Sequence, residues 1–237
     1  IIHHHSGVAG FAEYAVLPKE ALVKIDNDIP FEHAALFGCG VVTGVGAVIN
    51  TANAREEDIV AIVGLGGVGL SALLASLAVG SKKTIAIDLS DEKLTLAREL
   101  GADHTLNPKD ENFLEEMRDL TFGGANIAIE TAGSGRALET AYEITRRGGT
   151  TVAAGMPGPG VNITLSHLSI AAEERVLKGS YMGSCVAQRD IPKYLNMFQT
   201  GKLPVDRLLS RKIKFEDLNE AMDRLDDAKT VREVLIP

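Results

Sequence analysis

Three glycines have the spacing that is needed to bind a pyrophosphate. Gly64, Gly66 and Gly69 follow the apolar, β-branched run 59–63 and precede an Ala/Leu-rich stretch. In such a Gly-x-Gly-x-x-Gly turn, the first glycine permits the bend and the second lets a pyrophosphate approach the backbone; the third lets the next helix pack on its strand. That helix would also offer unpaired N–H groups to phosphate oxygens.

A carboxylate lies where a ribose would be bound. Asp88 ends a second apolar run, 84–88, and follows Gly69 by 19 residues. A carboxylate at this place accepts hydrogen bonds from both ribose hydroxyls and repels a 2′-phosphate, which favours NAD over NADP. The alternative is that Asp88 caps the helix predicted from Asp91, but Ser90 suits that role better.

From about residue 46 the sequence alternates predicted strands and helices, which indicates an α/β fold. Such alternation predicts a Rossmann doubly wound parallel sheet, with a ligand crevice at the carboxyl ends of the strands. The predicted strands are 59–63, 84–88, 104–106, 126–131, 149–155 and 176–182, and the predicted helices after the glycine turn are 91–100, 110–120 and 136–146. Small residues near 131–133 and 154–156 would leave space there for a flat ring.

The flanking segments do not continue this alternation. Before residue 46 we predict two short strands, 11–17 and 22–25, and a helix with Pro30 in its first turn that leads to Cys39 between two glycines. After residue 183 we predict a helix at 189–199, a strand at 211–215, an amphipathic helix at 215–225 and a closing strand at 231–236. We therefore expect three segments, 1–45, 46–183 and 184–237.

Charge and cysteine content exclude several classes of protein. The formal net charge of −8, without a compensating basic cluster, argues against a nucleic-acid or anionic-membrane partner. The uncharged stretch between Asp58 and Lys82 is long enough to span a bilayer, but its glycines predict a buried strand and helix instead. Two cysteines, Cys39 and Cys185, make no disulfide framework, so we expect a cytoplasmic protein.

Five motifs occur in an order that resembles the zinc-dependent alcohol dehydrogenases of the medium-chain dehydrogenase/reductase superfamily. They are Phe11-Ala-Glu-Tyr-Ala, Gly38-Cys39-Gly40-x-x-Thr43-Gly44, the turn Gly64 to Gly69, Asp88, and Val231-Arg232-Glu-Val-Leu. The resemblance covers nearly all of the chain. It implies that 1–45 ends a GroES-like, β-rich catalytic domain, that 46–183 is the NAD-binding Rossmann domain, and that 184–237 returns to the catalytic domain.

The resemblance also implies a role for individual residues. Cys39 would be a zinc ligand, Thr43 would lie beside the nicotinamide, and Arg232 would pair with the pyrophosphate through its bidentate guanidinium. Asp88 and Lys93 would hold the adenosine ribose. The full set of implied cofactor contacts is Thr43, Gly64, Leu65, Gly66, Gly67, Val68, Gly69, Asp88, Lys93, Thr131, Ala154, Met156 and Arg232.

The match to the family is incomplete at the metal. A catalytic zinc site of the Cys₂His type, as in alcohol dehydrogenase, needs three protein ligands. In this sequence only one of them, Cys39, has a counterpart. The resemblance implies that the other two ligands precede residue 1, and that the chain is roughly the last two-thirds of such an enzyme. His3, His4 and His5 are either substitute ligands or a tag-like terminus, and the second is favoured. His33, His104 and His167 are interpreted as helix, strand and loop residues.

The expected activity is hydride transfer between NAD and an alcohol or its aldehyde or ketone, with zinc required in the complete enzyme. Two alternatives stay open, which are an NAD-binding fragment without catalysis and a zinc-free quinone or enoyl reductase of the same superfamily. The resemblance further implies a homodimer or homotetramer in which sheets join across edge strands near 176–182.

Overall fold

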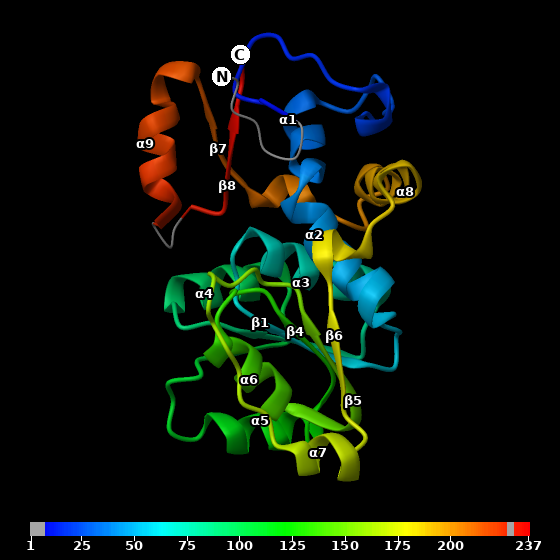
Figure 1. Ribbon diagram of the computed structural model, residues 1–237, viewed down its shortest axis with the longest axis vertical. Helices are drawn as coiled ribbons and strands as arrows, with labels where there is room; N and C mark the ends of the chain where they lie inside the picture. Colours follow the sequence, from blue (N-terminus) through cyan, green and yellow to red (C-terminus); the bar gives the residue numbers. More distant parts are fainter. Residues whose placement is uncertain (1–7, 227–229) are drawn as a thin grey trace.

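A six-stranded parallel sheet forms the lower half of the molecule in the computed structural model, which describes residues 8–226 and 230–237 (Figure 1). The strand order is β3-β2-β1-β4-β5-β6. Their bounds are β1 Ile59–Val63, β2 Lys83–Ile87, β3 His104–Leu106, β4 Ala125–Glu130, β5 Thr145–Ala153 and β6 Val176–Gly179. The order reverses direction between β1 and β4, which is the Rossmann topology, so the predicted fold class is confirmed.

Two hydrophobic clusters cover the two faces of this sheet. One face of β1 and β4 contributes Val60, Ile62 and Ile129 to a core that also includes α3 (Gly67–Val79) and α4 (Asp91–Leu100). The other face packs against α5 (Phe113–Thr121) and α6 (Gly135–Glu143). Because β1 is buried on both faces, it consists only of apolar residues, as expected for a central parallel strand.

The upper half of the molecule contains short helices and a second sheet (Figure 1). Helix α2 (Gly40–Gly46) continues into the π-helical turn η3 (Ala47–Ala52), so the expected boundary between residues 45 and 46 falls inside one helical segment. Strands β7 (Leu209–Ile213) and β8 (Arg232–Leu235) pair in parallel. The remaining helices here are α1 Phe31–Ala34, η1 Lys19–Ala21, η2 Ala35–Gly38, η4 Tyr181–Ser184, α8 Ala187–Gln199, η5 Val205–Leu208, η6 Phe215–Asp217, α9 Leu218–Asp223 and η7 Arg224–Asp226.

The two strands predicted near the start of the chain are wrong. Residues 11–17 and 22–25 have no strand conformation. Alternation of apolar and polar residues favours a strand only where a neighbouring strand can pair with it. Here Tyr14 and Val16 are 90% and 100% exposed, so these side chains cover no core within the described residues.

Several other predicted boundaries needed correction. Helix α5 begins at Phe113 rather than residue 110, and α6 ends at Glu143 because Thr145 already pairs in β5. The last strand of the sheet ends at Gly179 instead of residue 182. A helix that was not predicted, α7 (His167–Ala172), places His167 in its first turn, so the interpretation of this residue as part of a loop was wrong.

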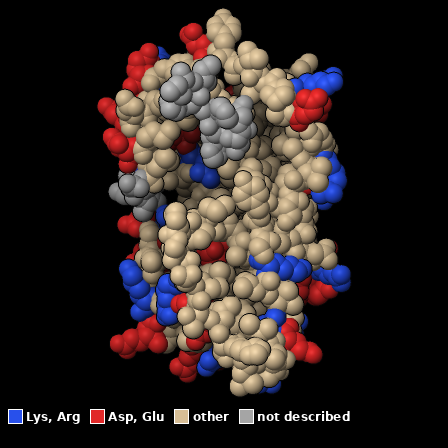
Figure 2. Space-filling model, in the orientation of Figure 1, with Lys and Arg blue, Asp and Glu red and all other residues tan. Residues whose placement is uncertain are grey.

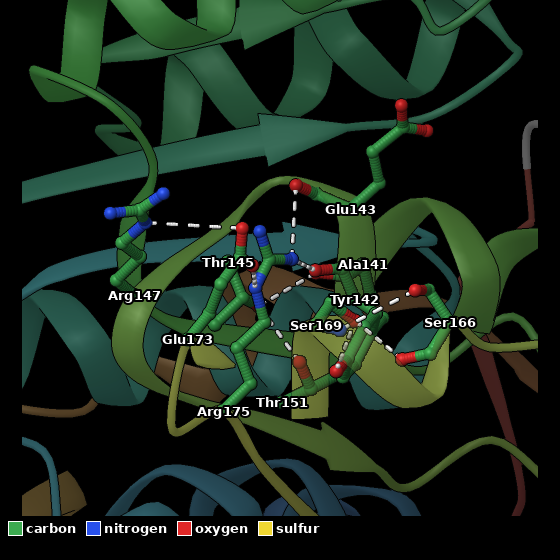
Figure 3. Close-up of polar contacts among 10 residues, drawn as sticks. All are labelled: Ala141, Tyr142, Glu143, Thr145, Arg147, Thr151, Ser166, Ser169, Glu173 and Arg175. Atoms are coloured by element: carbon green, nitrogen blue, oxygen red, sulfur yellow. Dashed lines mark hydrogen bonds and ion pairs between the residues drawn. The ribbon is translucent and has the colours of Figure 1, made fainter. Parts of the chain in front are cut away.

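A polar cluster fastens the edge strand β6 to the end of α6 (Figure 3). The Arg175 guanidinium donates to the backbone carbonyls of Tyr142 and Glu143, which end α6, and lies over the Tyr142 ring. Its Nε also forms an ion pair with Glu173 at 2.6 Å. The Tyr142 hydroxyl lies 2.9 Å from the hydroxyl of Ser169 in α7. Arg175 therefore caps the C-terminus of α6 and also fixes the position of the start of β6.

Charged and apolar surfaces are unevenly distributed. On the face seen in Figure 2, acidic and basic side chains alternate along the margins, while the centre is mostly uncharged.

Within the described part of the chain, no single helix has the length and apolar character to span a membrane. The bent pair 31–38 and 40–52 passes this test by length and composition, but all of α2 is buried inside the fold.

Candidate functional site

The glycine turn between β1 and α3 has the geometry that the sequence predicts. Gly64 has a φ of +93°, a left-handed conformation that favours glycine. A Cβ on Gly69 would lie only 1.8 Å from the Gly64 carbonyl oxygen, so glycine is required for α3 to pack on β1. In contrast, a Cβ on Gly66 would meet no atom within 4 Å. The turn therefore leaves open space at the position where a phosphate is expected.

Asp88 lies beside this turn and its carboxylate orders the surrounding backbone. Its Oδ2 accepts a hydrogen bond from the Leu65 N–H at 2.7 Å, and its Oδ1 accepts one from the Ser90 N–H at 3.0 Å. A carboxylate has about four acceptor positions, so capacity remains for ribose hydroxyls. Ser90 caps α4 by accepting from the Lys93 N–H, which confirms that Asp88 is not the cap.

A cavity of about 760 Å³ opens beside Asp88 and the glycine turn. Six residues that the sequence singled out line it, namely Gly64, Leu65, Gly66, Asp88, Lys93 and Thr131. The sequence analysis missed Leu89, Lys109 and Arg136, which also line it. Leu89 is 57% exposed directly after Asp88, so an apolar residue that follows the acidic end of a strand was the available signal. The cavity combines an apolar wall with side chains of both charges, the cations Lys93, Lys109 and Arg136 and the carboxylates Asp88, Asp110, Glu111 and Glu143. An apolar wall with a few polar groups is typical of a small-molecule site.

Arg232 reaches from β8 to the first turn of α3. A Cβ on Gly40 would lie 2.1 Å from its Nη2, and a Cβ on Gly67 would lie 2.3 Å from its Cζ, so a side chain at either position would displace the guanidinium. Burial lowers the pKa of Arg232, but an arginine remains protonated in proteins. A fixed positive charge and the unpaired N–H groups of a 13-residue helix thus meet at one point, as the pyrophosphate role requires.

Cys39 and Thr43 lie on the other side of Arg232. Cys39 is exposed, immediately precedes α2 and lines a second cavity of about 380 Å³ together with Gly40 and Arg232. Thr43 is 7% exposed, and its hydroxyl donates to the Cys39 carbonyl oxygen at 2.8 Å. It also lies 3.8 Å from the sulfur of Met182.

The described residues do not form a zinc site. Among residues 8–226 and 230–237, no group of three or more His, Cys, Asp or Glu side chains is placed to hold a metal ion. Cys39 offers one thiolate, whereas a catalytic zinc needs three protein ligands. His3, His4 and His5 lie outside the described residues, and His33 and His104 belong to a helix and a strand as predicted. No catalytic step is therefore assigned to zinc here.

Two loops at the carboxyl ends of β4 and β5 hold the remaining predicted contacts. The Thr131 hydroxyl donates to the Gly64 carbonyl oxygen at 2.6 Å, which joins the first loop to the glycine turn. A Cβ on Gly133 would lie 2.7 Å from the Met156 carbonyl oxygen, so the two loops touch through backbone. Ala154 is half-buried and Met156 is 72% exposed.

Met182 is a further candidate residue of the site, which the sequence analysis had placed in a strand. It adopts a left-handed φ of +48°, which is unfavourable for a side chain of this size. Its sulfur contacts Thr43, and the adjacent Gly183 packs so closely on Gly46 that neither could carry a Cβ. The Met-Gly pair after the strand was the available signal for a turn.

A buried polar network holds this turn in place. Asn50 donates to the Gly183 carbonyl oxygen at 3.2 Å and to Asp190 at 3.3 Å. The hydrogen-bonded Arg189 side chain, with help from the Val186 N–H, lowers the pKa of Asp190 to about 2. Asp190 is 3% exposed, so its charge depends on these partners. The network links α8, η3 and the turn at Met182.

The fold and this arrangement of a glycine turn, an adjacent carboxylate and a half-buried arginine are typical of a dinucleotide-binding Rossmann protein. Residues 67–200, more than half of the chain, match the family described as zinc-binding dehydrogenase. The chain belongs to this family, within the zinc-dependent alcohol dehydrogenases of the medium-chain dehydrogenase/reductase superfamily.

Known relatives agree with this assignment. The chain is 32% identical to S-(hydroxymethyl)glutathione dehydrogenase of Paracoccus denitrificans, covering 99% of this chain and 64% of the relative. The crystal structure of benzyl alcohol dehydrogenase from Acinetobacter calcoaceticus matches with a TM-score of 0.91 and 30% identity, over 96% of this chain and 63% of that one. An NADP-bound zinc-binding dehydrogenase of Sinorhizobium meliloti 1021 matches with a TM-score of 0.87 and 25% identity, over 96% and 66%. The chain thus spans somewhat less than two thirds of these proteins.

Proposed function

We propose that this chain binds NAD along the carboxyl edge of its sheet and takes part in NAD-linked oxidation of an alcohol or reduction of an aldehyde or ketone. The observation that carries the proposal is the arrangement around the N-terminus of α3: Asp88 and Gly66 line the large cavity beside it, and the Arg232 guanidinium lies against Gly67 from the other cavity. Asp88 would accept from the ribose hydroxyls, while Arg232 and the first turn of α3 would bind the pyrophosphate. In the oxidation, hydride leaves the alcohol carbon for C4 of the nicotinamide, and a proton is released.

The chain's own residues orient the cofactor in this reaction. Thr43, Ala154 and Met156 would line the nicotinamide half, and Lys93 would reach the adenosine ribose from α4. Holding the nicotinamide in one orientation and excluding water are the contributions of the protein to hydride transfer. Cys39 would supply one of three ligands to the zinc of a complete enzyme, and the others are not among the described residues.

One finding favours a second candidate function, an NAD-binding chain without catalysis. The part of the chain that is described contains no group of metal ligands, so binding and turnover are separable properties here. The preference for NAD over NADP rests on Asp88 alone, and a relative of this chain was solved with NADP bound.

The experiment is a titration of the chain with NADH and NADPH, followed by nicotinamide fluorescence. Binding of NADH at least tenfold tighter than NADPH supports the NAD site, and no binding of either would refute it. Turnover is then tested with zinc and a panel of primary and secondary alcohols. A change in NADH absorbance supports the dehydrogenase, whereas binding without turnover supports the second candidate.

We also propose that the protein is a cytoplasmic homodimer or homotetramer without a nucleic-acid or membrane partner. Two free cysteines, one of them exposed, fit a reducing compartment. Strand β6 is exposed along its whole length and lies at the edge of the sheet, where a second copy could extend it. The net charge of −8 supports the proposed absence of polyanionic partners.

A further inference from the structure

A carboxylate that the proposed chemistry does not use is buried at the carboxyl edge of the sheet. Glu130, the last residue of β4, is 2% exposed. Its Oε1 accepts a hydrogen bond from the Gly133 N–H at 2.6 Å, and the N–H groups of Ala132, Ser134 and Gly155 also face the carboxylate. Among the ion pairs of residues 8–226 and 230–237, none involves Glu130. Backbone N–H groups therefore take the place of a cation.

These N–H groups belong to two different loops. The loop after β4 supplies Ala132, Gly133 and Ser134, and the loop after β5 supplies Gly155. The backbone carbonyl of Glu130 reaches the second loop as well, because it accepts from Ala154 at 2.9 Å and from Gly155 at 3.0 Å. One residue thus ties both loops to the end of a central strand.

The two loops pack so closely that there is no space for a side chain between them. A Cβ on Gly155 would lie 2.2 Å from the Gly133 nitrogen and 2.7 Å from the Glu130 Oε1. The loops are therefore held at backbone contact distance, with the carboxylate between them. Several N–H groups that point at one buried place need an acceptor, since unpaired buried donors are costly.

Burial of an unpaired carboxylate also has a cost. Burial raises the pKa of Glu130, while the surrounding N–H groups act in the opposite direction. An apolar residue at this strand end would avoid the cost of burying a carboxyl group but would leave the N–H groups of both loops without an acceptor. The side chain of Glu130 is therefore matched to the loops that surround it.

We propose that Glu130 is a positioning residue that holds the loops 131–134 and 154–156 in the conformation that receives the nicotinamide half of the cofactor. The inference rests on the proposed function, because it takes from there the assignment of these loops. Glu130 itself touches no cofactor in this scheme. It acts through the backbone of Gly133 and Gly155.

The proposal is tested by comparing two ligands in the intact chain. Glu130→Gln keeps one acceptor oxygen but turns an NH₂ group toward the N–H donors. We expect the Kd for NADH to rise about tenfold, as for the loss of a hydrogen bond to a charged group, and the Kd for AMP to change less than twofold. AMP reports the Asp88 side of the site only. Glu116→Gln, which removes an exposed carboxylate on α5, is the matched control and should change neither value.

Three results separate the possible explanations. Equal losses for NADH and AMP, or no loss for either, would overturn the positioning role. Failure of the unchanged chain to bind NADH would instead refute the proposed function, which is a different outcome. Gly155→Ala disrupts the same contact between the loops, but from the loop after β5, and should reproduce the selective loss of NADH affinity.

A measurement on the unchanged chain tests the proposal even where the substituted chains do not fold. If Glu130 holds the first loop, the amides of Ala132, Gly133 and Ser134 exchange hydrogen slowly in the absence of any ligand. Exchange at the rate of a free surface loop would overturn the proposal without any substitution.

Discussion

At the scale of single residues, Asp88 combines two tasks that sequence patterns treat separately. Its carboxylate accepts from the backbone of Leu65 in the glycine turn and from Ser90 before α4, and it also lines the large cavity. The same charge that shapes the loop is thus available to a ribose. A substitution at Asp88 is consequently expected to change both the loop geometry and the choice of cofactor, and a control variant is needed to separate the two effects.

Asp88→Asn is expected to weaken NADH binding and to relax discrimination against NADPH. The loss of a charged acceptor for the ribose hydroxyls corresponds to roughly 1–3 kcal/mol of binding free energy. The control is Asp103→Asn, because the Asp103 carboxylate also accepts from a backbone N–H, that of Thr84 at 2.7 Å, but lies outside the cavity. Both variants should lose stability, and only Asp88→Asn should change the ratio of the two Kd values. An unchanged ratio would leave Asp88 a purely structural role.

At the scale of elements, two glycines of one turn have opposite constraints. Gly69→Ala would force a Cβ to within 1.8 Å of the Gly64 carbonyl oxygen, so α3 must move away from β1. We expect a loss of about 1–3 kcal/mol in the free energy of unfolding, as for overpacking in a core. Gly66→Ala meets no atom within 4 Å and has an ordinary φ of −73°, so its stability should be unchanged. Gly66→Ala should nevertheless weaken the binding of NADH, because the added methyl group would occupy the space through which the pyrophosphate approaches the backbone.

Urea denaturation and NADH titration of both variants check this pair. A stable Gly66→Ala that binds NADH normally would mean that phosphate does not approach this backbone.

Helix α8 and the turn at Met182 depend on the ionisation of Asp190. The pKa of Asp190 is lowered to about 2 in the folded chain from an ordinary value of 3.8. A lowered pKa means that the carboxylate stabilises the fold above about pH 3.8, and that this stabilisation is lost as the pH falls toward 2. Asp190→Asn should cost about 2 kcal/mol at pH 7, and the difference should shrink below pH 3.8.

Denaturation curves from pH 7 to pH 3 measure this dependence. Asp119→Asn, which changes an exposed residue of α5, serves as the control and should follow the unchanged chain at each pH. A difference between Asp190→Asn and the unchanged chain that stays constant with pH would contradict the assigned ionisation.

The sequence was sufficient for elements whose signals are local. Strand β1, helix α4 and strand β3 were predicted to the residue or nearly so, because buried runs and the Ser90 cap mark their ends. Residues 11–17 carry the same alternation as a strand but lack a partner among the described residues, and pairing is not a local property. Met182 was misplaced although Gly183 is a local signal for a turn, because the close packing that holds this turn involves the distant Gly46 and Asn50.

At the scale of the whole molecule, the small sheet β7–β8 brings Arg232 to the first turn of α3, where we propose that it binds the pyrophosphate. Arg232→Met should therefore weaken ADP by about tenfold or more and leave adenosine unchanged, because only ADP carries the phosphates that the guanidinium would bind. Isothermal titration measures both ligands. Arg211→Met on the neighbouring strand, a half-exposed arginine with a 3.9 Å ion pair to Glu233, is the control. Equal losses for ADP and adenosine would contradict the phosphate role of Arg232.

The exposed edge at β6 predicts the quaternary structure. Leu177→Lys places a charge on the edge strand and should shift a dimer toward the monomer, because a lysine on an edge strand opposes pairing with a second strand. Light scattering across a range of concentrations measures the change. Phe122→Lys replaces an 89% exposed aromatic residue after α5 and should leave the mass unchanged. A monomeric unchanged chain at micromolar concentration would contradict the proposed oligomer.

The reach of Arg232 across the molecule has a consequence for the order of events during synthesis. A ribosome makes the glycine turn and all six strands of the large sheet before it adds Arg232. The guanidinium of this side chain occupies the space beside Gly40 and Gly67. A nascent chain can thus form its sheet early, but it acquires the charge that would neutralise a pyrophosphate only when strand β8 emerges. With the pyrophosphate role proposed for Arg232, a chain whose strand β8 has not yet been made would bind the cofactor more weakly than the finished chain.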